Sequence, residues 1–426
     1  MKKVMLKTTL SLAVTLASTQ LFASGFALNE QSISGMGTGF AGRSSSADDA
    51  STVFGNPAGM SLLKSDQVTA GVAAIDANTN IKHTRGGPPG GTSDGDMVPF
   101  TSVPMGYFVK QLGDGWAVGL GAYAPFGLIT NYEGSSASRY YGDKSDVKVV
   151  TLQPTISYAF NDIVSIGFGP TINRISGQLT SATPFAPTFG RNDGKVNIRG
   201  DDTAIGYNVG ILVQPTDGTR LGLTYHSKVK YELDGHTNIS GVGFGPANGS
   251  RYKASLDITT PEVVDFSITQ KLDDQWTVYA GTSWTRWSRL KDITVKNQGV
   301  PPLLGGSAGP IGTITEEQNW HDTWASAIGV SYQLNKEWVL RSGFSVDQAP
   351  TNNTDRSVRV PTGDRKAISF GAGYNPTADW TIDAAISYLK EEDVNVNLNS
   401  PSKGGLYSAK YKNSAWGYGL GATYKF

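Results

Sequence analysis

The chain has 426 residues, of which 36 are basic and 36 acidic, and it contains no cysteine. The balanced charge argues against a nucleic-acid-binding protein, and the lack of cysteine excludes a disulfide framework, thiolate chemistry and a lipid-anchored N-terminal cysteine. Glycine is abundant, with 52 residues, and mean hydropathy is slightly negative. A helical membrane protein would be more apolar, whereas a β-barrel with every second residue facing a wet lumen has this composition.

The first residues are typical of a secretory signal peptide. Lys2, Lys3 and Lys7 form a basic start, and the apolar run Leu10–Leu16 that follows is too short to span a bilayer. We expect cleavage after Ala23, which would remove residues 1–23. No later stretch approaches the ~20 apolar residues of a spanning helix, so the mature chain is expected to be periplasmic, secreted or in an outer membrane.

Residues 24–66 are rich in glycine, serine and alanine and have neither helical nor strand periodicity. A G-x-G-x-x-G match at residues 37–42 lacks the preceding strand and the βαβ unit of a dinucleotide-binding fold. The neighbouring acids Asp48 and Asp49 lack further oxygen ligands for a cation, and the four histidines lack metal-ligand spacing. We therefore expect no cofactor and no metal.

From residue 67 onward, apolar residues alternate with small or polar ones in runs of roughly 9–11 residues, the length of one tilted strand across a bilayer. In residues 164–172, for example, Val, Ile, Phe, Pro and Ile alternate with Ser, Gly, Gly and Thr. Fourteen such runs begin near residues 67, 98, 115, 146, 163, 202, 219, 252, 275, 321, 337, 365, 379 and 414. The sequence therefore predicts an all-β membrane protein, with a 14-stranded antiparallel transmembrane β-barrel over residues 67–426.

The connections between these runs alternate in length. Six are short and contain turn residues, and seven are irregular, near residues 79–97, 125–145, 174–201, 234–251, 286–319, 347–364 and 390–413. Long and short loops at opposite ends, with both chain ends on the short side, are the plan of bacterial outer-membrane barrels. A tryptophan follows four of the short turns, which predicts an aromatic belt at one membrane interface. These residues are Trp116, Trp276, Trp338 and Trp380.

Fourteen strands enclose a lumen too wide for inward side chains to fill. Residues 24–66 are the one unassigned segment long enough to occupy it, so we predict that they form an N-terminal hatch that plugs the lumen. An open lumen would instead make a general diffusion porin, which stays as an alternative.

Several stretches match a known family. In the N-terminal segment, residues 25–26, 30–32, 41–42, 47–52 and 56–60 read GF, EQS, AG, ADDAST and NPAGM. Later stretches read APFGL at 124–128, WHDT at 320–323 and PTGDR at 361–365. With these stretches the chain resembles the FadL/TodX family of outer-membrane transporters of long-chain fatty acids and other hydrophobic compounds.

The resemblance implies a hatch inside a fourteen-stranded barrel and a third strand that kinks inward to leave a lateral gap at Pro125, Phe126 and Gly127. Proline and glycine near a strand end are typical of a bulge or break, although a simple strand end would look the same. The turn Asn56-Pro57-Ala58 would set where the hatch touches the wall, and we predict that it takes part in gating.

We predict passive uptake of hydrophobic compounds, above all long-chain fatty acids. Phe26 and Leu28 are the candidates for contact with the acyl tail. Arg174, His321 and Arg365 are the candidates for its carboxylate, with a lumen ion pair as the alternative role of each arginine. The family commonly carries lysine at the position of His321, where the charge of a histidine would depend on pH.

Capture of the cargo is assigned to apolar residues of the long loops, including Phe185 and Pro301–Leu304. A second alternative keeps this architecture and changes the cargo to aromatic or alkane hydrocarbons, which need no cation. No catalytic motif stands out, so we expect no enzyme.

The expected location is the outer membrane of a Gram-negative bacterium, with outer-membrane lipid, lipopolysaccharide and the barrel-assembly machinery as partners and no nucleic acid. The terminal Phe426 is typical of chains that the assembly machinery recognises.

Overall fold

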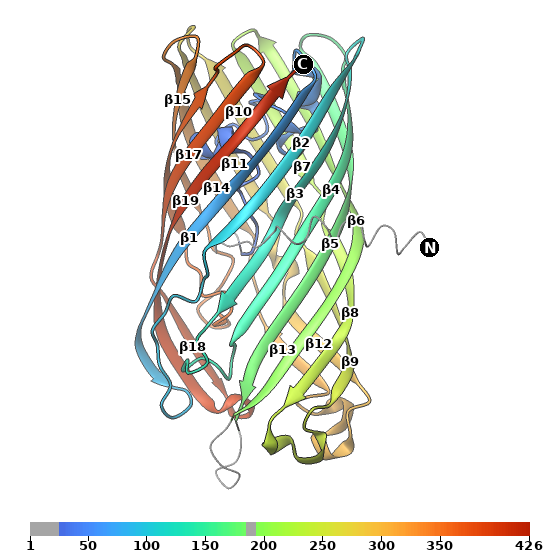
Figure 1. Cartoon of the computed structure of the whole chain (residues 1–426), viewed down its shortest axis with the longest axis vertical. Helices are drawn as coiled ribbons and strands as arrows, with labels where there is room; N and C mark the ends of the chain where they lie inside the picture. Colours follow the sequence, from blue (N-terminus) through green and yellow to red (C-terminus); the bar gives the residue numbers. More distant parts are fainter. Residues whose placement is uncertain (1–24, 185–192) are drawn as a thin grey trace.

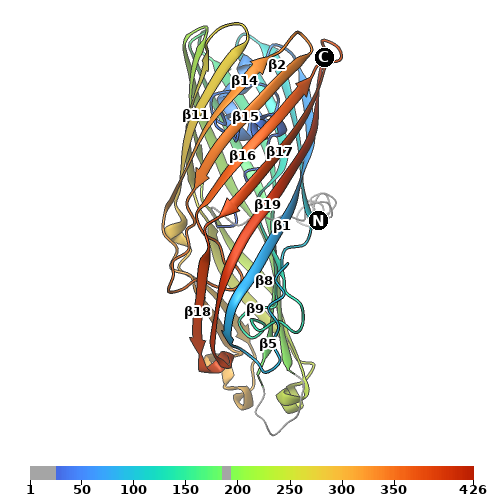
Figure 2. The same cartoon turned by 90° about the vertical axis from the view of Figure 1, so that its left-hand side faces the viewer.

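The computed structural model describes residues 25–184 and 193–426, and within these ranges it contains nineteen β-strands in one antiparallel sheet. The sheet closes on itself because β1 (Gln67–Gly86) pairs with β19 (Gly405–Lys425) on one side and with β2 (Thr101–Gly113) on the other. Figures 1 and 2 show the resulting elongated cylinder of tilted strands. No helix in the described ranges is long and apolar enough to cross a membrane.

The nineteen strands make fourteen crossings, as predicted. Nine crossings are single strands, namely β1, β2, β19 and β3 (Trp116–Asn131), β4 (Lys144–Ala159), β5 (Val164–Thr183), β6 (Gly194–Thr216), β15 (Trp338–Asp347) and β16 (Arg365–Tyr374). Each of the other five consists of two consecutive strands with a short interruption. These are β7 (Thr219–His226) with β8 (Val229–Ser240), β9 (Arg251–Thr260) with β10 (Val263–Lys271), β11 (Trp276–Thr285) with β12 (Asp292–Gln298), β13 (Thr313–Glu317) with β14 (Thr323–Gln333), and β17 (Trp380–Glu391) with β18 (Val394–Ser400).

The helices of the described chain are short. Three belong to the N-terminal segment, which we define as residues 25–66, one lies in the interruption between β11 and β12, and the others lie in the connections at the long-loop end. They are α2 (Ile33–Gly37), α3 (Thr52–Gly55) and η1 (Pro57–Leu62), followed by η3 (Val242–Ala247), η4 (Trp287–Arg289), η5 (Pro302–Leu304), η6 (Gly306–Ala308) and η7 (Pro401–Lys403).

The predicted aromatic belt is present at the short-turn end of the barrel. Each of the four tryptophans packs on a tyrosine of the adjacent strand, with ring centroids 4.5–4.9 Å apart. Such rings suit the headgroup layer, since one end is apolar and the other polar. The pairs are Trp116 with Tyr158, Trp276 with Tyr332, Trp338 with Tyr374, and Trp380 with Tyr424.

At the long-loop end the strands extend much further than predicted. Residues 174–201 and 390–413 were expected to be loops, yet most of them lie in β5, β6, β18 and β19. In β19, Trp416 and Leu420 are exposed in the lipid-facing part, whereas further along Tyr407 and Tyr411 are buried inside. Lys410 points outward there, because beyond the bilayer the outer face meets water. In these extensions the apolar residues face inward and the polar residues face outward, the reverse of the membrane-spanning part. A search for apolar residues on the outward face therefore does not detect them.

The N-terminal segment lies inside the cylinder, towards the end with the short turns (Figures 1 and 2). Inward-facing glycines of the wall allow its close approach, since a Cβ atom at these positions would press against the segment. Such glycines occur around the whole wall, at Gly71, Gly119, Gly167, Gly210, Gly222, Gly281, Gly329, Gly343, Gly371 and Gly419.

Replacing one of these glycines tests how tightly the segment is packed. A Cβ at Gly343 would collide with the backbone of Thr38 and Gly39, whereas a Cβ at Gly106 meets no atom within 4 Å. We expect Gly343→Ala to destabilise the folded barrel by roughly 1–3 kcal/mol, because overpacking forces the backbone to shift. Gly106→Ala is the matched control. Thermal unfolding in detergent, followed by circular dichroism, measures both, and equal midpoints would contradict the tight packing.

Candidate functional site

An apolar cavity lies within the long-loop part of the barrel. It contains about 870 Å³ of space, in part open to solvent. Its lining is dominated by aliphatic side chains, which the reversed alternation of the extended strands turns inward. Among them are Ile175, Leu233, Leu256, Ile258 and Val295, together with Phe26 of the N-terminal segment. A cavity of this size and lining fits a hydrophobic ligand.

An aromatic cluster lies at the point where the N-terminal segment meets this cavity. The ring of Phe26 is 4.9 Å from Trp287, 5.7 Å from Phe126 and 6.1 Å from Trp320, measured between centroids. Trp320 and Phe26 also line the cavity. Gly25 adopts a φ of +64°, and a Cβ there would collide with Trp320. The structure therefore places Phe26 in the lining of the apolar cavity, and its contact with an acyl tail stays a prediction.

Leu28, the other predicted tail contact, lies elsewhere. It is buried in a different apolar cluster, with Met105 and Tyr123, and does not line the cavity. Phe26 and Leu28 lie on either side of Ala27, which pairs with Phe126 of β3, and the two side chains pack in separate apolar clusters.

β3 changes its hydrogen-bonding partner at the predicted kink. Pairing between β3 and β2 ends at Ala122 with Gly106, and the register of β3 with β4 shifts between Tyr123 and Phe126. Beyond this point the edge of β3 that faced β2 pairs with the N-terminal segment, which the sequence did not predict. The Leu28 amide donates to the Pro125 carbonyl at 2.9 Å, the Gly127 amide donates to the Phe26 carbonyl at 2.8 Å, and Gln31 Nε2 donates to the Ala124 carbonyl at 2.6 Å.

The turn Asn56-Pro57-Ala58 joins the N-terminal segment to β5 and β6. Asn56 Nδ2 donates to the carbonyls of Ser44 at 2.7 Å and of Ile211 at 3.0 Å, while its Oδ1 accepts from the Ala58 amide. The Ala58 carbonyl in turn accepts from Ser165 Oγ at 3.0 Å. The turn therefore fixes the segment against the wall, as a gating element would require.

The three predicted carboxylate-binding cations do not line the apolar cavity. Arg174 lies on the outer face of β5, in register with the exposed Phe168, and forms an ion pair with Asp201 at 2.9 Å. His321 is exposed just before β14. Arg365 points inward but is buried in an ion pair with Asp347 at 2.8 Å, beside a separate, more polar space. Arg365 was expected to face the lumen and does. Arg174 was also expected to face the lumen but lies outward with Phe168 and Ile172, because the outer face of β5 carries charged residues where it continues past the bilayer.

The buried cation at the cavity is Arg359, which the sequence analysis missed. It lies in the β15–β16 segment, defined as residues 348–364, which turns back into the barrel instead of projecting outward. Val358 and Val360, on either side of Arg359, are buried there, and the Val358 carbonyl accepts from Tyr132 Oη at 2.7 Å. The stretch has no helix or strand, as the predicted loop requires, and the valines on either side of Arg359 were the available signal that it turns inward.

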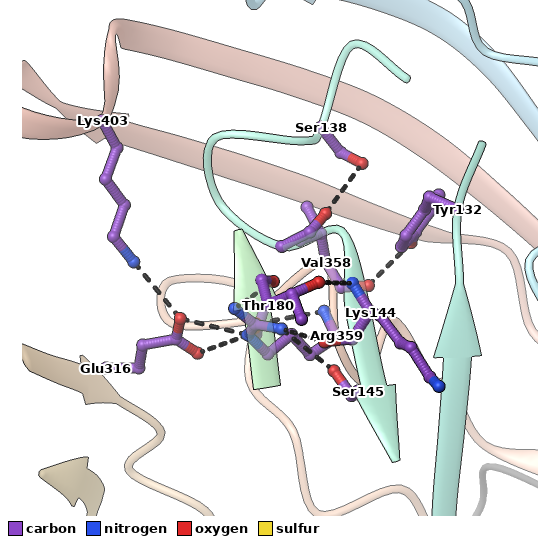
Figure 3. A network of polar contacts seen from close by, with 11 residues as sticks. Tyr132, Ser138, Lys144, Ser145, Thr180, Glu316, Val358, Arg359 and Lys403 are labelled. Atoms are coloured by element: carbon purple, nitrogen blue, oxygen red, sulfur yellow. Dashed lines mark hydrogen bonds and ion pairs between the residues drawn. The ribbon is translucent and has the colours of Figure 1, made fainter. Parts of the chain in front are cut away.

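Arg359 makes a dense polar network (Figure 3). Its Nε donates to both oxygens of Glu316, at 3.1 and 3.2 Å. One terminal nitrogen donates to the Lys144 carbonyl and to Ser145 Oγ, and the other donates to the Thr180 carbonyl at 3.0 Å. Lys403 Nζ also reaches Glu316, at 3.3 Å.

The predicted capture residues are only partly described. Phe185 lies outside the described residues. Pro301 and Pro302 lie at the start of η5, Pro302 is exposed, and Leu304 packs against the cluster around Phe244. None of these three lines the apolar cavity, so their role in capture stays a prediction.

Comparison with known proteins gives matches along the whole chain. The family model described as outer membrane protein transport protein (OMPP1/FadL/TodX) matches residues 14–426. A long-chain fatty acid transport protein of Escherichia coli O6:H1 is 28% identical over 456 residues, covering 100% of this chain and 99% of that protein. Outer membrane protein P1 of Haemophilus influenzae is 30% identical, with 90% of each chain covered.

Solved structures agree in fold. A FadL homologue of Pseudomonas aeruginosa has a TM-score of 0.82 and 25% identity, covering 94% of this chain and 100% of that one. The toluene transporter TodX of Pseudomonas putida has a TM-score of 0.69 at 18% identity, covering 94% and 99%, which is a likeness of fold alone.

Removing the Asn56 side chain tests its anchoring role. Asn56→Ala would leave the buried Ser44 carbonyl and Ala58 amide without this partner, at roughly 1–3 kcal/mol per group. We expect the N-terminal segment to loosen and ion-conducting events to become more frequent in planar bilayers. Asn80→Ala, on the exposed face of β1, is the control and should leave conductance unchanged. Identical recordings from the two variants would argue against an anchor at Asn56.

Proposed function

This chain belongs to the outer membrane protein transport family (OMPP1/FadL/TodX) and is an outer-membrane protein, and we propose on this premise that it admits long-chain fatty acids by passive diffusion. The observation that carries the proposal is the apolar cavity that ends on Phe26, next to the point where β3 leaves β2.

The energetics of the cargo favour a route of this kind over a water-filled pore. Each methylene group exposed to water costs ~0.8 kcal/mol, so a chain of ~15 methylenes loses roughly 12 kcal/mol in an aqueous channel. A selective path must therefore stay apolar and must end in lipid. The cavity supplies the apolar part of this path, and a gap in the wall would supply the exit.

In the proposed route, the apolar residues of the long loops, including Pro301–Leu304 and Phe185, capture the cargo, and the apolar cavity binds its tail against Phe26. The N-terminal segment acts as the hatch. When the hatch moves, it withdraws the backbone partners of Pro125–Gly127, and the cargo leaves sideways past Phe126 into the outer leaflet. The surrounding lipid and lipopolysaccharide are then partners, and the barrel-assembly machinery is needed for insertion.

Two other functions remain as alternatives with distinct outcomes. Hydrocarbons would fit the same apolar cavity, since contact with its aliphatic lining does not require a charged group on the ligand. A general porin would require a lumen open to ions and sugars, and the packing of residues 25–66 against the wall glycines speaks against it.

Reconstitution tests the function directly. We expect liposomes that contain the purified protein to take up palmitate faster than empty liposomes, and to keep salt and sugars out. A pH-sensitive dye inside the vesicles reports arrival of the acid, and liposome swelling reports sugar entry. Vesicles with a sixteen-stranded porin serve as the control for leakage. Free passage of sugars through this protein would end the proposal.

Movement of the hatch can be tested with an engineered disulfide, because the native chain has no cysteine. The hydroxyl oxygens of Ser44 and Ser267 lie 2.9 Å apart, so a Ser44→Cys/Ser267→Cys pair would tether the N-terminal segment to β10. We expect palmitate uptake to fall at least tenfold on oxidation and to recover on reduction.

The matched control places a disulfide within the wall. The hydroxyl oxygens of Thr282 and Ser326 lie 3.1 Å apart on β11 and β14, and a Thr282→Cys/Ser326→Cys pair should leave uptake unchanged in both redox states. Uptake that is equally fast with the Ser44–Ser267 tether closed would show that the hatch need not move.

A further inference from the structure

Arg359 is the buried cation in the lining of a mostly apolar cavity, whose lining also includes the exposed Arg199. The Arg359 side chain is 7% exposed and lines the cavity together with aliphatic residues such as Val360 and Leu290. A buried charge is unfavourable unless it is paired, so its partners decide what it can do.

The partners of Arg359 do not balance its charge fully. Within the described chain, the ion pairs of Arg359 and of Lys403 both end on the single carboxylate of Glu316. Two cations therefore share one anion, which leaves a net charge of about +1 in this group. The guanidinium has five N–H donors. Four are used, by Glu316, the Lys144 carbonyl, Ser145 Oγ and the Thr180 carbonyl. The second N–H of the nitrogen that donates to Thr180 makes no further hydrogen bond to residues 25–184 or 193–426.

A fatty acid complements this site in two ways. Its tail fits the aliphatic lining, and its carboxylate supplies the missing negative charge at the edge of the cavity. A guanidinium is the preferred partner of a carboxylate, because its planar fork matches the two oxygens. A neutral hydrocarbon or alcohol would gain the tail contacts and leave the charge unbalanced.

We propose that Arg359 selects cargo with a carboxylate over neutral cargo of the same length, and that Glu316 competes with this carboxylate for the guanidinium. The inference rests on the proposed uptake of hydrophobic compounds and specifies its substrate class. Arg359 then has the role of binding the cargo's carboxylate, for which the sequence analysis named Arg174, His321 and Arg365.

Arg359 also holds the β15–β16 segment to β4 and β5, and a purely structural role must be distinguished from recognition. If the Arg359–Glu316 ion pair only holds the segment in place, then Arg359→Gln and Glu316→Gln break the same contact and change palmitate binding in the same direction. If Arg359 recognises the carboxylate, the two variants have opposite effects, since Glu316→Gln frees the guanidinium and Arg359→Gln removes it.

The experiment measures binding of palmitate and of cetyl alcohol, the neutral alcohol of equal chain length, to the full-length protein in detergent. Trp320 lines the cavity, so quenching of tryptophan fluorescence is a suitable signal. For Arg359→Gln we expect palmitate to bind roughly 10- to 100-fold more weakly, which corresponds to the loss of a hydrogen bond to a charged group. Cetyl alcohol should bind within about twofold of the wild type.

Three further variants complete the test. Glu316→Gln should bind palmitate more tightly and cetyl alcohol as before. Arg359→Lys keeps the charge and should retain most of the preference for the acid, which guards against a folding defect in Arg359→Gln. Arg356→Gln is the control, because Arg356 is buried in the same segment and bonded to Thr362 and Asn395, but does not line the cavity. It should leave the ratio of the two affinities unchanged.

The outcomes separate the inference from the function on which it rests. Equal loss of both ligands in Arg359→Gln, or weaker palmitate binding in Glu316→Gln, overturns the role of Arg359 and leaves transport of hydrophobic compounds intact. Wild-type protein that binds cetyl alcohol as tightly as palmitate also overturns it. Wild-type protein that binds neither ligand overturns the proposed function as well.

Discussion

Backbone hydrogen bonds join the wall of the barrel to the segment inside it at the kink of β3. A strand in a membrane protein must have all its backbone groups paired, because unpaired groups in an apolar medium cost several kcal/mol each. β2 stops supplying these partners at Gly106, and residues 26–31 take over with the bonds to Ala124, Pro125 and Gly127. The interruption of the wall is therefore tolerated only while the N-terminal segment is in place. If the N-terminal segment moves, the hydrogen bonds of β3 at the kink must change as well.

A second constraint is that the outer face of the same sheet meets lipid along one part of its length and water along the other. In the lipid-facing part, outward residues such as Ile205 and Leu420 are apolar, and inward ones are small. Beyond it, β8 exposes Lys230 and Glu232 and buries Tyr231 and Leu233. This reversal creates an apolar interior above the membrane surface, and the apolar cavity lies there. The cavity is thus a consequence of the strand pattern.

The charged residues inside the barrel also differ between the lipid-facing part and the part beyond the membrane. At the level of the N-terminal segment, two inward arginines each have their own carboxylate: Arg341 pairs with Asp383 at 2.6 Å and Arg365 with Asp347 at 2.8 Å. Such pairs fix positions in a polar lumen and leave little free charge. Arg359 differs because its carboxylate is shared with a lysine and because it borders the apolar cavity. Pairing, more than burial, distinguishes a structural arginine from one that can meet an anionic ligand.

The sequence by itself determined the barrel, the number of crossings and the side on which the long loops lie. Each of these depends on local alternation, on turn residues and on tryptophans such as Trp116 and Trp380, all of which can be read along the chain. The resemblance of short motifs also pointed to Phe26, which lines the cavity, and to Pro125–Gly127, where β3 changes its hydrogen-bonding partner; their roles in transport stay predictions.

The tertiary structure alone decided which cation meets the cavity and what replaces β2 as the partner of β3. Both depend on contacts between residues far apart in the chain, such as Arg359 with Glu316 and Leu28 with Pro125. The direction of Arg174 was misjudged because the strands continue past the membrane with reversed polarity. Alternation gives the two faces of a strand, but only the closed sheet and the solvent on each side decide which face is the inside.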